Sequence, residues 1–188
     1  MPNNDGVTVL TTEERAEWYK AVFGLYAHYV FDPARTDPLP QYLNNLKVAS
    51  ANLVVLDEAH FMSAEILAGG IRDFVDDGNS PGKPMRIIVV CSGRQPGDVL
   101  LVFLATYCHV YDIICATTPI DLTAELEHLA SRPNERQDVL KYMRSYAALC
   151  KAGAEHGDVI SKRPDIKKTQ SIEVPAGMRI TFVVEPLG

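Results

Sequence analysis

The stretch Ala51-Asn52-Leu53-Val54-Val55-Leu56-Asp57 contains an unbroken apolar run that ends in a carboxylate. A second run of the same kind occupies residues 86–90 and is followed by Cys91-Ser92-Gly93. Strands that are buried on both faces have such continuous runs, whereas half-exposed strands alternate between apolar and polar residues. The two runs therefore predict strands of a parallel sheet that helices cover on both faces.

Further segments extend this pattern along the first 130 residues. The expected strands are residues 7–10, 26–31, 51–56, 86–90 and 110–115. Five helices are expected to alternate with them, in the segment that begins at Thr11 and over residues 41–49, 63–75, 96–108 and 121–130. Right-handed crossovers then give a three-layer, doubly wound, parallel five-stranded sheet. In such a sheet a functional site is expected at the carboxyl ends of the strands.

The first helix has two expected features of its own. Thr11 and Glu14 have the spacing of a capping box, in which each side chain accepts a hydrogen bond from a free backbone amide. Trp18, Val22 and Leu25 have helical spacing and are expected to form its apolar stripe, with Tyr19 and Phe23 beside it.

The chain is expected to have one α/β domain over residues 1–132 and an extension over residues 133–188. The extension is predicted to contain a helix at 135–152, a basic linker at 153–170 and a β-like segment at 171–186. Residues 1–131 hold 8 Lys and Arg against 17 Asp and Glu, and the remainder holds 10 against 7. Because the main body is acidic, broad binding to nucleic-acid phosphates is not expected.

The composition is that of a globular protein, with 47% hydrophobic and 22% charged residues. No apolar run approaches the roughly 18 residues of a membrane span, and the first residues lack the pattern of a signal peptide. The four cysteines share no CxxC spacing, so we expect free thiols in a reducing compartment. A cytoplasmic protein without membrane insertion is the expectation.

Asp57-Glu58-Ala59-His60 matches the motif that follows a nucleotide-binding strand in many helicases, where the two carboxylates serve Mg²⁺ and water. That chemistry also needs a Gly-rich loop ending in Lys-Ser or Lys-Thr, and the sequence has none. A fragment of a nucleotide hydrolase is therefore an alternative and not the leading interpretation. The five histidines lie on different elements without HExxH spacing, so neither a metal site nor a cofactor is expected.

The stretch 52–57 resembles the third strand of bacterial receiver domains, whose terminal Asp accepts a phosphoryl group. The fourth receiver strand ends in Ser or Thr, and Ser92 is the match. The fifth ends in a Lys-Pro pair, where this sequence has Thr118-Pro119. The resemblance covers roughly residues 7–131 and implies a flavodoxin-like fold with Asp57 at the position of the phospho-acceptor.

Other positions depart from the receiver pattern. Receivers have an acidic pair directly after the first strand, where this chain has Thr11 and Thr12, and Glu13 follows one residue later. The lysine that pairs with the phosphoryl group is replaced by Thr118. Mg²⁺ prefers carboxylate and water oxygens, and phosphoryl transfer needs positive charge around the moving group. We therefore expect a degenerate phospho-acceptor site and no enzymatic activity, with a phospho-accepting response regulator as the alternative.

Residues 96–108 are apolar nearly all round, although a helix on a sheet needs only one apolar stripe. We expect part of this helix to lie in a protein–protein contact, in a homodimer or with another cytoplasmic protein. The residues expected at that interface are Leu100, Leu101, Phe103, Leu104, Tyr107 and Tyr111.

Residues 86–114 also resemble the degenerate receiver domains at the front of TadZ/CpaE-type pilus-assembly ATPases. This resemblance implies a non-catalytic regulatory module that localises or assembles a pilus, secretion or conjugation machine. In that family a strand leading into a phosphate-binding loop follows, and residues 178–184 match the strand without the loop. The alternative for this segment is a hairpin strand added to the domain's own sheet.

Overall fold

The computed structural model describes residues 6–82 and 85–143, together with the short strands Ile172–Val174 and Met178–Ile180. The chain divides into two compact units, Met1–Ala147 and Ala148–Gly188. The first unit thus extends beyond the boundary expected at residue 132.

The first unit contains one five-stranded sheet in which every pair of neighbouring strands is parallel. Its strands are β1 Val7–Leu10, β2 His28–Val30, β3 Leu53–Asp57, β4 Arg86–Val90 and β5 Asp112–Ile114. They lie in the order β2-β1-β3-β4-β5, which is the flavodoxin-like order. The expected α/β fold with a doubly wound five-stranded sheet is therefore confirmed.

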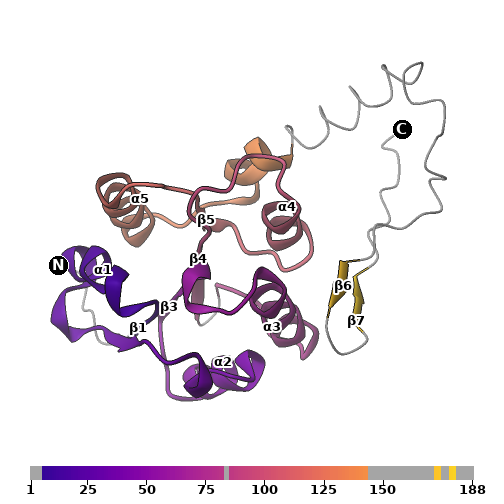
Figure 1. Ribbon diagram of the computed structural model, residues 1–188, viewed down its shortest axis with the longest axis horizontal. Helices are drawn as coiled ribbons and strands as arrows, with labels where there is room; N and C mark the ends of the chain where they lie inside the picture. The colour runs from indigo at the N-terminus through magenta and orange to yellow at the C-terminus, as the bar shows by residue number, and fades with distance from the viewer. Residues whose placement is uncertain (1–5, 83–84, 144–171, 175–177, 181–188) are drawn as a thin grey trace. The chain divides into compact units, whose positions relative to one another are not determined.

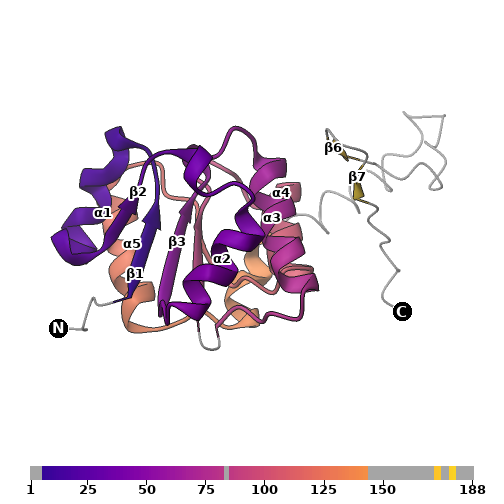
Figure 2. The same ribbon diagram turned by 90° about the horizontal axis from the view of Figure 1, so that it is seen from below.

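Five α-helices cover the two faces of this sheet. They are α1 Ala16–Phe23, α2 Leu39–Val48, α3 Ala64–Asp76, α4 Val99–Thr106 and α5 Pro119–Ser131. Figure 1 shows α1 and α5 side by side on one face, and α2, α3 and α4 on the other. Figure 2 shows the same layers from below. Short 3₁₀ turns lie at Glu13–Arg15, Gly24–Tyr26, Pro33–Arg35, Glu58–His60 and Arg136–Val139.

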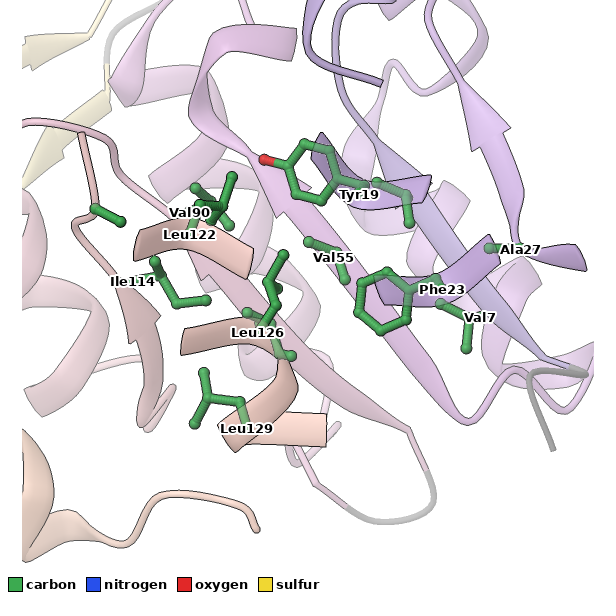
Figure 3. Packing of buried hydrophobic residues seen from close by; sticks show 13 residues of the cluster. Val7, Tyr19, Phe23, Ala27, Val55, Val90, Ile114, Leu122, Leu126 and Leu129 are labelled. Atoms are coloured by element: carbon green, nitrogen blue, oxygen red, sulfur yellow. The ribbon is translucent and has the colours of Figure 1, made fainter. Parts of the chain in front are cut away.

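One buried cluster lies between the sheet and the pair α1 and α5 (Figure 3). Val55, Val90 and Ile114 come from the strands, and Leu122 and Leu126 come from α5. Each fully buried Leu or Ile side chain contributes roughly 1.5–3 kcal/mol relative to an exposed one.

The buried face of α1 lies one position away from the expected stripe, on the two residues that were expected beside it. Tyr19 and Phe23 are the buried side chains, whereas Trp18 and Val22 are only partly buried and Leu25 is 82% exposed. The helix begins after the 3₁₀ turn Glu13–Arg15 and ends at Gly24, whose positive φ of 68° favours glycine, so Leu25 falls beyond its last turn.

The helices α2 and α3 approach each other closely at Gly70. A Cβ atom there would lie 2.7 Å from Cβ of Leu39, which is shorter than a carbon–carbon contact allows. Glycine at this position therefore permits the packing of the two helices.

The strands β6 Ile172–Val174 and β7 Met178–Ile180 pair with each other in an antiparallel register. They form a separate two-stranded sheet, and among the described residues neither strand joins the five-stranded sheet. The expectations for residues 144–152 and the basic linker 153–170 lie outside the described residues. No helix in the described part of the chain combines the length and apolarity that crossing a membrane requires.

Candidate functional site

The carboxyl ends of β1, β3 and β4 bring together Thr11, Asp57 and Ser92. These three residues follow or end adjacent parallel strands, which is why their side chains converge at one edge of the sheet. The sequence analysis placed all three in one degenerate site. The structure confirms that they lie together, and it connects them through a fourth residue, Arg15.

The carboxylate of Asp57 is completely buried and accepts four hydrogen bonds. Its Oδ2 accepts from the Thr11 hydroxyl at 2.9 Å and from the Tyr19 hydroxyl at 2.6 Å. Its Oδ1 accepts from the Arg15 guanidinium at 2.9 Å and from the Ala59 backbone N–H at 3.1 Å. A carboxylate offers about four lone-pair positions, so these four donors fill its capacity.

The guanidinium of Arg15 also links the two strand ends. One of its terminal nitrogens donates to Asp57, and the other donates to the Ser92 hydroxyl at 2.6 Å. The guanidinium carbon lies 4.7 Å from the ring centroid of Trp18, a cation–π contact that supports the same orientation. Arg15 Nε is buried without a hydrogen-bond partner, an imperfection in an otherwise complete network.

The tyrosine and histidine beside the carboxylate are held in their neutral forms. Burial and the negative charge of Asp57 raise the pKa of Tyr19 far above its ordinary value, so its hydroxyl stays a donor. Burial lowers the pKa of His60, although the Thr11 carbonyl and the charges of Asp57 and Asp32 oppose that shift. His60 Nδ1 donates to the Thr11 carbonyl at 3.0 Å, which fixes the backbone from which the Thr11 side chain extends.

The expected capping box of Thr11 and Glu14 is absent, because Thr11 is not an N-cap residue: Thr12 precedes the 3₁₀ turn and Arg15 precedes α1. Thr12 occupies the N-cap position of the 3₁₀ turn without a side-chain cap, and the neighbouring Glu13 is exposed. Neither of these two residues has a hydrogen bond to the Asp57 carboxylate.

Thr118 is exposed, and its hydrogen bonds are all local. Its hydroxyl accepts from the Asp121 backbone N–H at 3.2 Å and donates to the Asp121 carboxylate at 2.7 Å. Thr118 therefore caps α5, which begins at Pro119, two residues before the start expected at residue 121. Proline at the first position of α5 explains the shift, because a helix readily begins at a residue that lacks an N–H.

A second charged cluster lies at the same edge, around Arg94. This side chain donates to both Glu58 oxygens at 2.8 and 2.5 Å and to both Asp98 oxygens at 2.9 Å. These hydrogen bonds, the one to Glu58 first, raise the pKa of Arg94. The Glu58 carboxylate, which the helicase-like motif would assign to metal and water, is thus paired with an internal cation.

An open depression of about 490 Å³ lies between the two arginines. Arg15, Ser92 and Arg94 form part of its lining, and Phe61 and Met62 form part of its apolar rim. Met62 is 90% exposed. In the described residues, no group of three or more His, Cys, Asp and Glu side chains is arranged to hold a metal ion.

The helix expected at a protein–protein contact is mostly covered within the chain. Leu100, Leu101, Phe103 and Leu104 are 7% exposed or less, so in the folded domain these four do not present the expected apolar surface. The helix has eight residues instead of thirteen, and it packs on the sheet beside α3. Its outward positions carry small side chains, Val99, Val102 and Thr106.

Of the expected interface residues, Tyr107 is 48% exposed and Tyr111 is half-buried. Tyr107 stacks on Phe103 with a centroid distance of 5.3 Å, and its hydroxyl lies 3.2 Å from an Asp76 oxygen. A contact through the C-terminal end of α4 stays a prediction, carried by Tyr107 and Tyr111.

Arg15, Tyr19 and Arg94 are site residues that the sequence analysis missed. A signal for the first two existed in their spacing, because positions 11, 15 and 19 recur every four residues and share one face of a helix. No comparable pattern links Arg94 to Glu58, which is 36 positions away. Comparisons with family models, curated proteins and solved structures find no match to this chain.

Proposed function

We propose that this chain is a non-catalytic, receiver-like module that acts through contacts with other proteins. In this proposal the Arg15 guanidinium replaces the metal and the lysine that would neutralise charge at Asp57 in a phosphorylated receiver. The observation that carries the proposal is the saturation of the Asp57 carboxylate by four internal donors.

Attack on a phosphoryl donor needs a free lone pair on the carboxylate. Both Asp57 oxygens already accept two hydrogen bonds each, and the side chain has no exposed surface. A Mg²⁺ ion would need nearly octahedral oxygen ligands at about 2.0–2.1 Å, a position that the Arg15 nitrogen, 2.9 Å from Oδ1, obstructs. Mg²⁺ or phosphoryl transfer would therefore require breaking a buried ion pair first.

We further propose a cytoplasmic location and a role in a pilus, secretion or conjugation machine. Cys91 and Cys108 are buried free thiols, which fits a reducing compartment such as the cytoplasm. The role in localising or assembling a pilus, secretion or conjugation machine rests on the resemblance to TadZ/CpaE-type ATPases.

Acetyl phosphate with Mg²⁺ tests the chemical part of the proposal. The wild-type chain and Asp57→Asn are incubated with the reagent, and intact mass is measured, with lysine acetylation separated from phosphorylation by its different mass. We expect no phosphorylated species in either protein. Gain of one phosphoryl group in the wild type, absent from Asp57→Asn, would promote the response-regulator alternative.

A further inference from the structure

The edge strand β5 is buried, although no strand among the described residues pairs with its outer side. Asp112, Ile113 and Ile114 are 6%, 2% and 0% exposed. Edge strands normally present unpaired backbone groups to solvent, and proteins often cover them with a helix or loop. Another part of the chain must therefore lie over this edge.

The cover is the segment 133–143, which follows α5 and is called the strap below. Two of its side chains, Val139 and Tyr142, are 0% and 4% exposed. The Tyr142 hydroxyl donates to the Ile113 carbonyl at 3.3 Å. Cys91 N–H donates to the Ile114 carbonyl, so the backbone groups of Ile113 face the free edge. Figure 1 shows the strap, in orange, beyond the β5 end of the sheet.

The strap begins with a polar latch on the first residue of β5. Asn134 donates from its backbone N–H to Asp112 Oδ1 at 2.7 Å and from its amide to the Tyr111 carbonyl at 3.2 Å. Arg86 donates to Asp112 Oδ2 at 3.0 and 2.7 Å and to the Leu129 carbonyl at 2.8 Å. The latch thus holds together β4, β5, the end of α5 and the start of the strap.

The middle of the strap lies on the surface. Between the latch at Asn134 and the buried side chains of Val139 and Tyr142, the residues Glu135, Arg136 and Gln137 are exposed. Only two residues, Arg132 and Pro133, separate the end of α5 from Asn134. Short connections of this kind favour exchange of a segment between two copies, because the segment can make the same contacts on a second molecule.

We propose that the strap is a removable cover of the β5 edge and that two copies of this chain associate by exchanging it. The segment that covers the edge in the dimer is the strap of a second copy, because β5 offers acceptors that match the donors of the strap. The Ile113 carbonyl accepts from a hydroxyl, and the Asp112 carboxylate accepts from a backbone N–H. This inference deepens the proposed function, on which it rests, by naming a surface and a partner. None of its contacts involves Asp57.

Cys115 reports whether the strap is seated. Cys115 is half-buried, and its thiol lies 3.8 Å from the Tyr142 hydroxyl in a depression that Lys141 and Tyr142 also line. Cys108 is 0% exposed and follows α4, near Asp76 and Arg72 of α3, so its alkylation reports global unfolding. Alkylation by iodoacetamide, followed residue by residue with mass spectrometry, therefore separates release of the strap from loss of the fold.

In Tyr142→Ala we expect Cys115 to be alkylated about tenfold faster or more, with no change at Cys108. A synthetic peptide of residues 133–143, added in trans, should restore the protection of Cys115. If Tyr142→Ala also exposes Cys108, the comparison is made with Tyr142→Phe, which deletes only the hydroxyl. Unchanged alkylation of Cys115, or a peptide without effect, overturns the removable cover.

Sedimentation of the full chain tests the exchange itself. The wild type should form a dimer whose share rises with concentration, and Tyr142→Ala should lose it. Insertion of Gly-Ser-Gly-Ser after Arg132 should also favour the monomer, because a longer connection eases the return of the strap to its own domain, the arrangement seen in this structure. A wild type that stays monomeric at all concentrations, or a dimer that Tyr142→Ala leaves intact, contradicts strap exchange. Either result leaves the acetyl phosphate test of Asp57 unaffected.

Discussion

Asp57 and Asp112 lie at opposite ends of the same sheet, and each is a buried carboxylate paired with an arginine. Asp57 ends β3 at the carboxyl edge, with Arg15 at 2.9 Å. Asp112 begins β5 at the amino edge, with Arg86 at 2.7 Å. The two pairs differ in the origin of their remaining hydrogen-bond donors. The donors to Asp57 close a site, whereas the donors to Asp112 attach the strap to the sheet.

Three of the four donors to Asp57 come from one short stretch, the end of β1 and the beginning of α1. They enclose the carboxylate at the edge where α/β sheets bind ligands. The donors to Asp112 come from β4 and from the strap, which are 48 residues apart at Arg86 and Asn134. The network around Asp57 therefore fills the site at the carboxyl edge, and the network around Asp112 attaches the strap to the sheet.

Removing Arg15 should have the largest effect on stability. Arg15→Met leaves the Asp57 charge buried without a cation, and we expect the free energy of unfolding to fall by about 3–5 kcal/mol. Urea denaturation followed by circular dichroism measures it. Arg35→Met is the matched control, because Arg35 lies 3.9 Å from Asp32 in an exposed pair; its loss should cost less than about 1 kcal/mol. Equal effects of the two substitutions would contradict a buried ion pair at Asp57.

Removing Arg86 should cost less, because the Asn134 N–H still donates to Asp112 and the Asp112 side chain keeps some solvent contact. We expect Arg86→Met to lower the free energy of unfolding by about 2–3 kcal/mol. Cys115 should also become easier to alkylate in this variant, whereas Arg15→Met should not expose it beyond its general destabilisation. A reversed order of the two stabilities would show that the latch, and not the closed site, is the stronger network.

The Tyr19 hydroxyl contributes one hydrogen bond to the closed site. Tyr19→Phe keeps the ring in the cluster of Figure 3 and removes that bond, at an expected cost of about 1.5 kcal/mol. Thermal and urea denaturation give the value. Tyr26→Phe, at a position that is 86% exposed, should be neutral. If Tyr19→Phe were as neutral as this control, the Asp57 carboxylate would not be saturated in solution.

The smallest effect is expected from the pH dependence of His60. Burial lowers its pKa below the ordinary value of 6.5, so the unfolded state takes up a proton first as the pH falls. This contribution to stability is fully present above pH 6.5 and is lost as the pH falls from there toward the folded-state pKa, at up to about 1.4 kcal/mol per pH unit. His60→Gln should flatten this slope, and the exposed control His28→Gln should keep it. A slope that survives in His60→Gln would assign the acid sensitivity elsewhere.

The strands and their convergence were predictable from the sequence. Unbroken apolar runs indicate parallel strands, and the carboxyl ends of such strands meet, so Thr11, Asp57 and Ser92 could be placed together. Arg15 and Tyr19 share a four-residue spacing with Thr11, but the direction in which that face points depends on the 3₁₀ turn that precedes α1, so the spacing alone did not place them at the site. Thr118 was misplaced for a similar reason, since its direction follows from where α5 begins.

The sequence did not show which distant segments of the chain cover α4 and the edge of β5. The apolar residues of α4 suggested an exposed surface, but their burial depends on how a short helix sits between its neighbours. The strap depends on Asn134 and Tyr142 meeting β5 across more than 20 residues, which no local pattern encodes. Periodicity describes a helix or strand by itself and does not say which segment will cover it.

We proposed above that Arg15 takes the place of a metal ion beside Asp57. Trp18, the only tryptophan of the chain, stacks on the Arg15 guanidinium, so its fluorescence reports whether that cation moves. The decisive measurement is a titration of the wild-type chain with Mg²⁺, alone and with beryllium fluoride as a phosphoryl mimic. If Arg15 closes the Asp57 site to metal, Trp18 fluorescence should show no saturable change. A saturable change that disappears in Asp57→Asn would show that metal reaches the carboxylate, and it would contradict the closed site.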